Sequence, residues 1–169
     1  MSIAVSQAWW FLPFVLPICF YVAYTDISEM RITNQAVIAL AVTFLIVGLI
    51  ALPLQDYGYR VLQMLGVLVV GIVLNAARVM GAGDAKFAAA AAGFIAPADL
   101  RFIIIIFTAN LLAAFVTHRL AKYSPLRRIA PHWKSWDMGK KFPMGFALGG
   151  SLAAYLILGA GLWDRITLQ

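Results

Sequence analysis

The sequence predicts an all-α, polytopic membrane protein with six transmembrane helices, and three observations lead to this prediction. Of the 169 residues, 63% are hydrophobic and only 12% are charged, which is more apolar than soluble domains are. The apolar residues form six segments separated by polar links. The Lys and Arg residues behind the net charge of +6 lie in these links, where positive charge sets membrane orientation. This placement argues against a nucleic-acid-binding surface.

Residues 1–169 are expected to form a single integral-membrane domain. The first segment begins near Trp9, which suits the aromatic belt at a membrane surface. Because residues 1–7 contain no Lys or Arg, this segment is not expected to be a cleaved signal peptide. Pro53 is expected to stop the second segment. The six helices are expected at about 8–24, 35–52, 60–77, 84–98, 102–117 and 144–163.

The fourth segment is the shortest of the six. Counted from Asp84 it has about 15 residues, or about 22 Å at 1.5 Å per residue, whereas a membrane span needs about 20 residues. Its alanine-rich run, Ala88–Ala92, is typical of helices that pack closely on other helices rather than on lipid.

The distribution of positive charge favours a crossing by this short segment. With six spans and an outer N-terminus, the cytoplasmic loops carry ten Lys and Arg residues and the outer loops carry three, as the positive-inside rule expects. A re-entrant fourth segment would remove most of that bias. The expected location is therefore the inner or plasma membrane. The cytoplasmic set is Arg31, Arg78, Lys86, Arg119, Lys122, Arg127, Arg128, Lys134, Lys140 and Lys141, and the outer set is Arg60, Arg101 and Arg165.

Two aspartates stand out as candidate catalytic residues, Asp26 and Asp84. Asp26 follows the first apolar segment, and Asp84 lies in the run Gly81–Lys86, directly before the short fourth segment. Taken alone, Asp26 is a solvated residue at the membrane surface and Asp84 is a helix-capping residue. With six spans, however, both lie at the cytoplasmic ends of helices, at similar depth.

Two neighbouring carboxylates share a proton, because the repulsion between two negative charges at short distance raises the free energy of the doubly ionised pair. The ionised carboxylate can take a proton from water, and the neutral one can donate a proton to a carbonyl oxygen. These are the two roles needed to hydrolyse a peptide bond without a metal or a covalent intermediate. The pair titrates as a unit, so the sequence does not assign the roles individually.

Other kinds of site fit the sequence less well, and no cofactor is expected. The single cysteine, Cys19, leaves no multi-cysteine zinc site. His118 and His132 have no carboxylates at ligand spacing and are expected to be satisfied or interfacial. The link 118–142 combines basic residues with tryptophans, which suits a segment lying on an anionic membrane surface.

Three motifs, in order along the chain, resemble those of the type IV prepilin leader peptidases. Asp26 followed by Arg31-Ile32-Thr33-Asn34 is similar to the first aspartate motif of that family, although Thr33 stands where proline is usual. Gly81-Ala82-Gly83-Asp84-Ala85-Lys86 is similar to the second motif, G-x-G-D-x-K. Phe142-Pro143-Met144-Gly145-Phe146-Ala147 resembles the proline-glycine motif that opens the last helix.

The resemblance implies an aspartic endopeptidase in which Asp26 and Asp84 are catalytic. It places the G-x-G-D motif at the cytoplasmic start of the fourth helix. Lys86 has two interpretations of equal weight, substrate contact or an orienting lysine, and Arg31 and Asn34 have structural ones, as loop anchor and N-cap of the second helix. The supporting or substrate-binding set is Gly81, Gly83, Lys86, Arg31, Asn34, Pro143 and Gly145.

The implied substrate is a prepilin-like membrane protein, cut on the cytoplasmic side of its apolar helix. The four-cysteine domain of the long family members is missing, so the chain resembles the short form found in tight-adherence (Flp) pilus systems, without N-methyltransferase activity. Archaeal preflagellin peptidases are an alternative of the same kind. The sequence indicates no oligomeric state.

Three further functions stay open. Presenilins and signal peptide peptidases also use a G-x-G-D aspartate, but here Thr25 separates Tyr24 from Asp26, unlike their Tyr-Asp motif. A proton-coupled transporter would need a carboxylate near the membrane midplane. A non-catalytic assembly subunit would tolerate loss of either aspartate.

Overall fold

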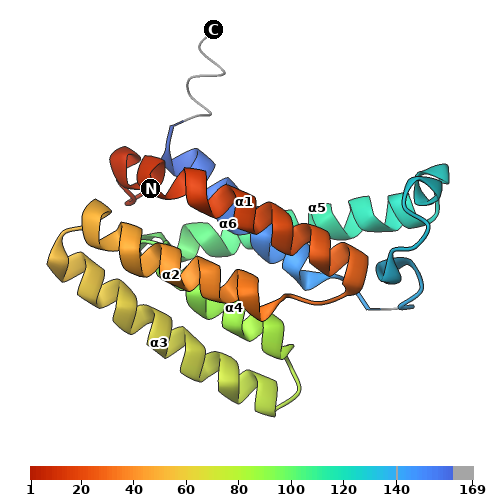
Figure 1. Cartoon of the computed structure of the whole chain (residues 1–169), viewed down its shortest axis with the longest axis horizontal. Coiled ribbons are helices and arrows are strands. Elements are labelled where there is room, and N and C mark those ends of the chain that lie inside the picture. The colour runs from red at the N-terminus through yellow and green to blue at the C-terminus, as the bar shows by residue number, and fades with distance from the viewer. Residues whose placement is uncertain (140, 162–169) are drawn as a thin grey trace, which may run out of the picture.

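The computed structural model describes residues 1–139 and 141–161, and within these residues it is all-helical, with no strand (Figure 1). The all-α prediction is therefore confirmed. Three short 3-10 helices, η1 (Pro97–Asp99), η2 (Pro125–Ile129) and η3 (Lys134–Trp136), lie in the connections. The six α-helices are α1 (Val5–Glu29), α2 (Asn34–Ala51), α3 (Leu54–Ala76), α4 (Ala82–Ala92), α5 (Leu100–Lys122) and α6 (Met144–Gly159).

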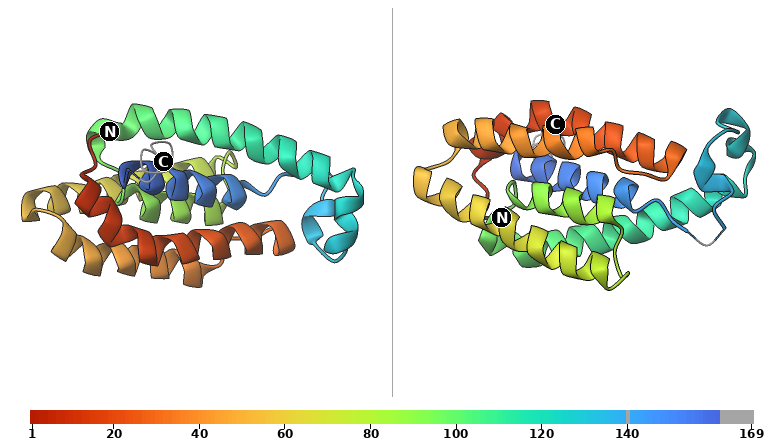
Figure 2. Two further views of the ribbon diagram at one scale, coloured as in Figure 1. Left: turned by 90° about the horizontal axis from the view of Figure 1, so that it is seen from above. Right: turned by 60° about the horizontal axis from the view of Figure 1, so that its bottom comes forward.

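The helices run alternately in opposite directions, so the bundle has two distinct ends (Figures 1 and 2). At one end α1, α3 and α5 finish and α2, α4 and α6 begin; we call it the aspartate end, because Asp26 and Asp84 lie there. We call the other the amino-terminal end, defined by Ser2, Arg60 and Asp99. Helix α1, with 25 residues, is about 37 Å long at 1.5 Å per residue and connects the two ends.

The two shortest helices, α4 and α6, lie inside the bundle. Helix α4 contacts α2, α3 and α6, while α6 contacts α1, α4 and α5. Small residues allow this close approach: a Cβ atom on Gly149 would lie 2.9 Å from the backbone oxygen of Cys19. Between α1, α2 and the end of α4, the rings of Phe11, Phe44 and Phe94 pack against one another, with centroids 4.9 Å (Phe11–Phe94) and 5.4 Å (Phe44–Phe94) apart.

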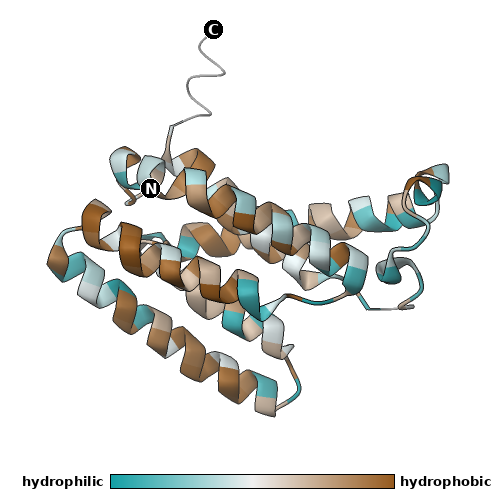
Figure 3. Cartoon of the chain, viewed as in Figure 1, coloured by the Kyte–Doolittle hydropathy of each residue, from teal (hydrophilic) through white to brown (hydrophobic). Residues whose placement is uncertain are grey.

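The outer helices carry the apolar surface that a bilayer requires. Helices α1, α2, α3 and the stretch Pro97–Lys122 are long and apolar enough to cross a membrane. Apolar residues follow α2 and α3 along their length, with hydrophilic residues at the start of α2 and toward the ends of α3 (Figure 3). The protein is therefore a membrane protein. Helices α4 and α6, with 11 and 16 residues, are shorter than a standard span, so the count of six spans stays a prediction.

Helix α4 ends earlier than expected, at Ala92 rather than near residue 98. The Gln63 side chain donates hydrogen bonds to the carbonyls of Ala92 (3.0 Å) and Ile95 (3.3 Å), which satisfies the helix end from α3. The following Pro97 holds Ala96 in an extended conformation. The expected end of the last helix at residue 163, and Arg165, lie outside the described residues.

Helix α3 begins earlier than expected, at Leu54 rather than near residue 60. Pro53 ends the preceding helix as predicted, but it also serves as the N-cap of α3. Arg60 is consequently a helical residue and only 4% exposed, whereas the charge count placed it in an outer loop.

Candidate active site

Asp26 and Asp84 line one cavity of about 260 Å³ at the aspartate end. Asp26 is in the last turn of α1, and Asp84 is in the first turn of α4, 58 positions later. Their proximity is tertiary, because α1 and α4 reach this end of the bundle from opposite directions. The other lining residues are Met30, Arg31, Ile32, Gly81, Gly83, Phe142 and Met144.

The Asp26 carboxylate is held at the start of α6. The backbone N–H of Gly145 donates a hydrogen bond of 2.6 Å to its Oδ2 atom. The first N–H groups of a helix have no partner within the helix and attract negative charge, so α6 orients this side chain. Only glycine fits here without displacement, since a Cβ atom on Gly145 would lie 3.0 Å from both Cβ and Cγ of Asp26.

The Asp84 carboxylate has a similar arrangement within its own helix. Gly81 is the N-cap of α4, and its backbone N–H donates to the carboxylate of Asp84, the third residue of the helix. This is one half of a capping box. A Cβ atom on Gly81 would lie 2.7 Å from Asp84 Oδ2, so this glycine leaves room for the carboxylate.

The link between α1 and α2 closes one side of the cavity. Helix α1 ends at Met30, whose φ of 57° is in the left-handed region, and this turn directs Arg31 and Ile32 toward α4. Ile32 packs on the glycine motif, because a Cβ atom on Gly83 would lie 3.3 Å from Ile32 Cβ. Gly83 therefore permits close contact between this link and α4.

Of the three polar residues of the supporting set, Arg31 lines the cavity, whereas Lys86 and Asn34 do not. Arg31 forms an exposed ion pair with Glu29, at 2.6 Å. Lys86 Nζ donates a hydrogen bond of 3.1 Å to Asn34 Oδ1, which ties α4 to the start of α2. The expectation that Asn34 caps α2 is wrong. Thr33 is the N-cap, and its Oγ1 accepts from the N–H of Ala36.

Pro143 and its neighbours form the third side of the cavity. Pro143 is the buried N-cap of α6 and does not line the cavity, whereas the flanking Phe142 and Met144 do. Sequence reasoning did not select these two side chains as site residues. Their place in the motif around Pro143 was the available signal, and it does not indicate which side chains of the motif line the cavity.

The link 118–142 packs beside this end of the bundle. Trp133 stacks on Trp136 (5.5 Å between ring centroids) and contacts Tyr24 of α1 (6.3 Å). His118 is buried between Trp136 and Phe142, and neither of its ring nitrogens has a hydrogen-bond partner among the described residues. The expectation of a satisfied histidine therefore fails for the ring nitrogens of His118, while its interfacial placement stays a prediction. His118 is near the end of α5, and its ring packs on aromatic side chains that follow this helix in the chain.

The arrangement brings two carboxylates to one cavity, each with a backbone N–H donor from the start of a helix. It also leaves space beside them for a third group such as a water or a peptide. Among the described residues, no group of three or more His, Cys, Asp or Glu side chains could hold a metal ion. The chemistry that these residues can offer is proton transfer between the two carboxylates and a bound group.

Comparison with known families identifies the chain. The type IV leader peptidase family matches residues 13–118, a stretch that contains both aspartates and most of the supporting set. Searches of curated proteins and of solved structures found no match. The chain belongs to the type IV leader peptidase family.

Proposed function

We propose that the protein is an intramembrane aspartic endopeptidase that removes the leader peptide of type IV pilin-like precursors of the Flp type. The observation that carries the proposal is that Asp26 and Asp84 line a single cavity, held by the N–H groups of Gly145 and Gly81 respectively. Family membership supports the reaction class.

The proposed mechanism uses the two carboxylates together. One is ionised and takes a proton from a water molecule, which attacks the carbonyl carbon of the scissile peptide bond. The other is protonated and donates to the carbonyl oxygen. Collapse of the tetrahedral intermediate breaks the C–N bond, and the leaving amine takes up the proton that the first carboxylate removed from the water. The roles belong to the pair and are not divided between Asp26 and Asp84.

The distribution of charge supports cleavage at the cytoplasmic membrane face. The connections α1–α2, α3–α4 and α5–α6 all lie at the aspartate end. They contain most of the Lys and Arg residues of the chain, and positively charged connections favour the cytoplasmic side. A precursor with an apolar helix in the bilayer and a basic leader would place the junction between the two at the cytoplasmic membrane face.

The test is co-expression with candidate precursors, with leader removal scored by a mobility shift on a gel. The wild type is expected to cut an Flp-type prepilin, and Asp26→Asn and Asp84→Asn are each expected to abolish cleavage. Asp137→Asn is the matched control, because its carboxylate is exposed and pairs with Arg127 away from the cavity. Unchanged cleavage in either aspartate variant would refute the paired mechanism.

The same experiment separates the alternatives. A preflagellin peptidase would cut a preflagellin and leave the Flp-type prepilin intact. A transporter or assembly subunit would cut neither precursor, and the positions of Asp26 and Asp84 at helix ends, away from the midplane, count against a transporter.

A further inference from the structure

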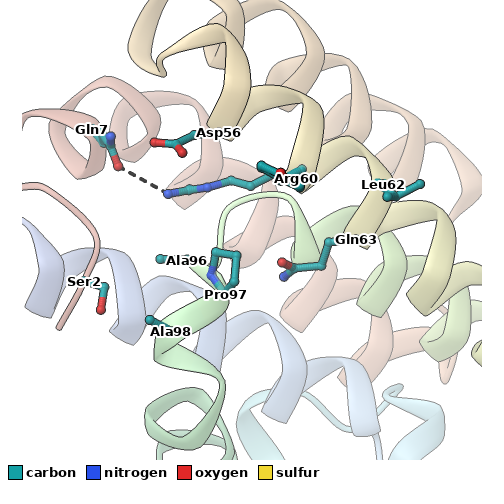
Figure 4. Close-up of a pocket in the computed structure, with 10 residues that line it drawn as sticks. Ser2, Gln7, Asp56, Arg60, Leu62, Gln63, Ala96, Pro97 and Ala98 are labelled. Atoms are coloured by element: carbon teal, nitrogen blue, oxygen red, sulfur yellow. Dashed lines mark hydrogen bonds between the residues drawn. The ribbon is translucent and has the colours of Figure 1, made fainter.

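The amino-terminal end of the bundle contains a second pocket, larger than the aspartate cavity, at about 680 Å³ (Figure 4). Helix α3 supplies one wall: Asp56, Tyr59, Arg60 and Gln63 recur at helical spacing and all line the pocket. The N-terminal segment and the turn after α4 supply the other walls. No step of the proposed peptidase reaction uses these residues.

Arg60 borders this pocket, and no carboxylate among the described residues contacts it in an ion pair. It is only 4% exposed, and its guanidinium bonds two neutral acceptors over long distances, the carbonyl of Phe94 (3.4 Å) and the side chain of Gln7 (3.3 Å). Its Nε atom is buried without a partner among the described residues. The ion pairs within the described residues lie elsewhere, at Arg31 and Arg127. The carboxylates of Asp56 and Asp99 act on this charge from a distance, but burial of a charged group without a contacting partner is costly. A phosphate in contact with the guanidinium would therefore stabilise it.

The nearby Asp99 attracts the charge of Arg60 but does not contact it. It accepts hydrogen bonds from the N–H groups of Ser2 (2.6 Å) and Ile3 (3.1 Å) and from the Tyr155 hydroxyl (2.8 Å). Three donors therefore already occupy this carboxylate. Asp56, one turn before Arg60 on α3, lines the same pocket but is exposed and forms no ion pair with Arg60.

We propose that this pocket binds the headgroup of a zwitterionic phospholipid that carries a primary ammonium, such as phosphatidylethanolamine. The phosphate enters between Arg60 and Gln7, where it replaces a long neutral hydrogen bond with a charge-assisted one. The ammonium lies toward Asp56, beside the same pocket (Figure 4). Arg60 and Asp56 carry opposite charges and are not in contact, so together they match the two charges of a zwitterion. A simple anion fits less well, because Asp56 would repel it.

The surface next to the pocket favours a lipid as the source of this headgroup. Leu62 lines the pocket and is 65% exposed, and Leu65 and Val69 continue an exposed apolar stripe along α3. Helix α3 is long and apolar enough to span the bilayer. A lipid with its headgroup in the pocket can therefore lay its acyl chains along this stripe.

The test is native mass spectrometry of the full-length protein in detergent, with equimolar phosphatidylethanolamine, phosphatidylcholine and phosphatidylglycerol. The wild type is expected to retain phosphatidylethanolamine preferentially. Arg60→Gln is expected to reduce that retention roughly tenfold, through loss of a charge-assisted contact. Arg101→Gln is the matched control, because Arg101 is an exposed arginine at the same end and does not line the pocket.

Asp56→Asn keeps the proposal falsifiable if Arg60→Gln does not fold. This exposed variant is expected to retain phospholipid but to lose the preference for phosphatidylethanolamine over phosphatidylcholine. Soluble phosphoethanolamine and inorganic phosphate, added as competitors, distinguish a lipid site from a site for the free phosphate compound. Retained phospholipid is expected to stay bound in the presence of either competitor if the acyl chains contribute to binding, and to be displaced if the pocket recognises the free compound. Equal retention of all three lipids by the wild type, or an unchanged preference in Asp56→Asn, overturns the proposal.

Discussion

The two ends of the bundle use buried polar groups in opposite ways. At the aspartate end, Asp26 receives an N–H from Gly145 and lies beside a second carboxylate in a cavity. At the amino-terminal end, Asp99 receives three donors and joins the N-terminus to α6. One carboxylate retains acceptor capacity for a substrate, while the other is saturated by the fold.

This difference indicates which carboxylate is structural. A carboxylate whose oxygens already accept several hydrogen bonds from the protein stabilises the fold, but it has little acceptor capacity left for a substrate or a proton. The backbone donors at the starts of α4 and α6 orient Asp84 and Asp26 without occupying every acceptor position. The comparison therefore predicts that substitutions at the two ends separate loss of stability from loss of cleavage.

The largest effect on stability is expected from Asp99→Ala. It leaves the buried N–H of Ile3 and the Tyr155 hydroxyl without their acceptor, at a cost of about 3 kcal/mol or more. Asp26→Ala removes one helix-capping bond and is expected to cost about 1 kcal/mol. Thermal unfolding in detergent, followed by tryptophan fluorescence, measures both, with exposed Asp137→Ala as control. Equal losses at Asp99 and Asp26 would contradict the distinction between the two ends.

The next largest effect is a loss of cleavage in Gly145→Ala. The new Cβ would approach Ile32 Cγ1 to 2.8 Å and Asp26 to 3.0 Å, so the carboxylate must move. A displacement of this size is expected to reduce leader cleavage about a hundredfold. Gly66→Ala is the matched control, since a Cβ atom on Gly66 would meet nothing within 4 Å. Full cleavage by Gly145→Ala would show that Asp26 does not need its present position.

The helices could be predicted from the sequence because they depend on strong local signals, whereas the placement of Asp26 and Asp84 at the same end followed from the alternating directions of the helices. Apolar segments define the helices, and a motif marks Asp84. Arg60 was misplaced, because composition does not reveal whether a charge after Pro53 lies in a loop or in the second turn of a helix that starts there. The lack of hydrogen-bond partners for the His118 ring among the described residues could not be predicted for a similar reason, since Trp136 and Phe142 come together with it only in three dimensions.

A smaller effect on stability is expected from Tyr155→Phe. The hydroxyl donates to Asp99 Oδ2 (2.8 Å) and accepts from the N–H of Ala96 (3.1 Å), and the side chain is fully buried. Its removal leaves one buried N–H unpaired, at about 1–2 kcal/mol. The unfolding assay is again suitable, and cleavage measured below the transition is expected to stay at the wild-type level, because Tyr155 lies at the opposite end from Asp26. A selective loss of cleavage would link the two ends.

The smallest effects come from two cations that each bond a neutral amide, one at each end. Lys86 donates to Asn34 in an exposed setting, whereas buried Arg60 donates to Gln7. Water can replace the amide for Lys86 but reaches Arg60 less readily, so Asn34→Ala is expected to cost under about 0.5 kcal/mol and Gln7→Ala about 1 kcal/mol. If denaturant titration in detergent gives the reverse order, the solvent around Arg60 already satisfies its charge, and the need for an anion in that pocket disappears.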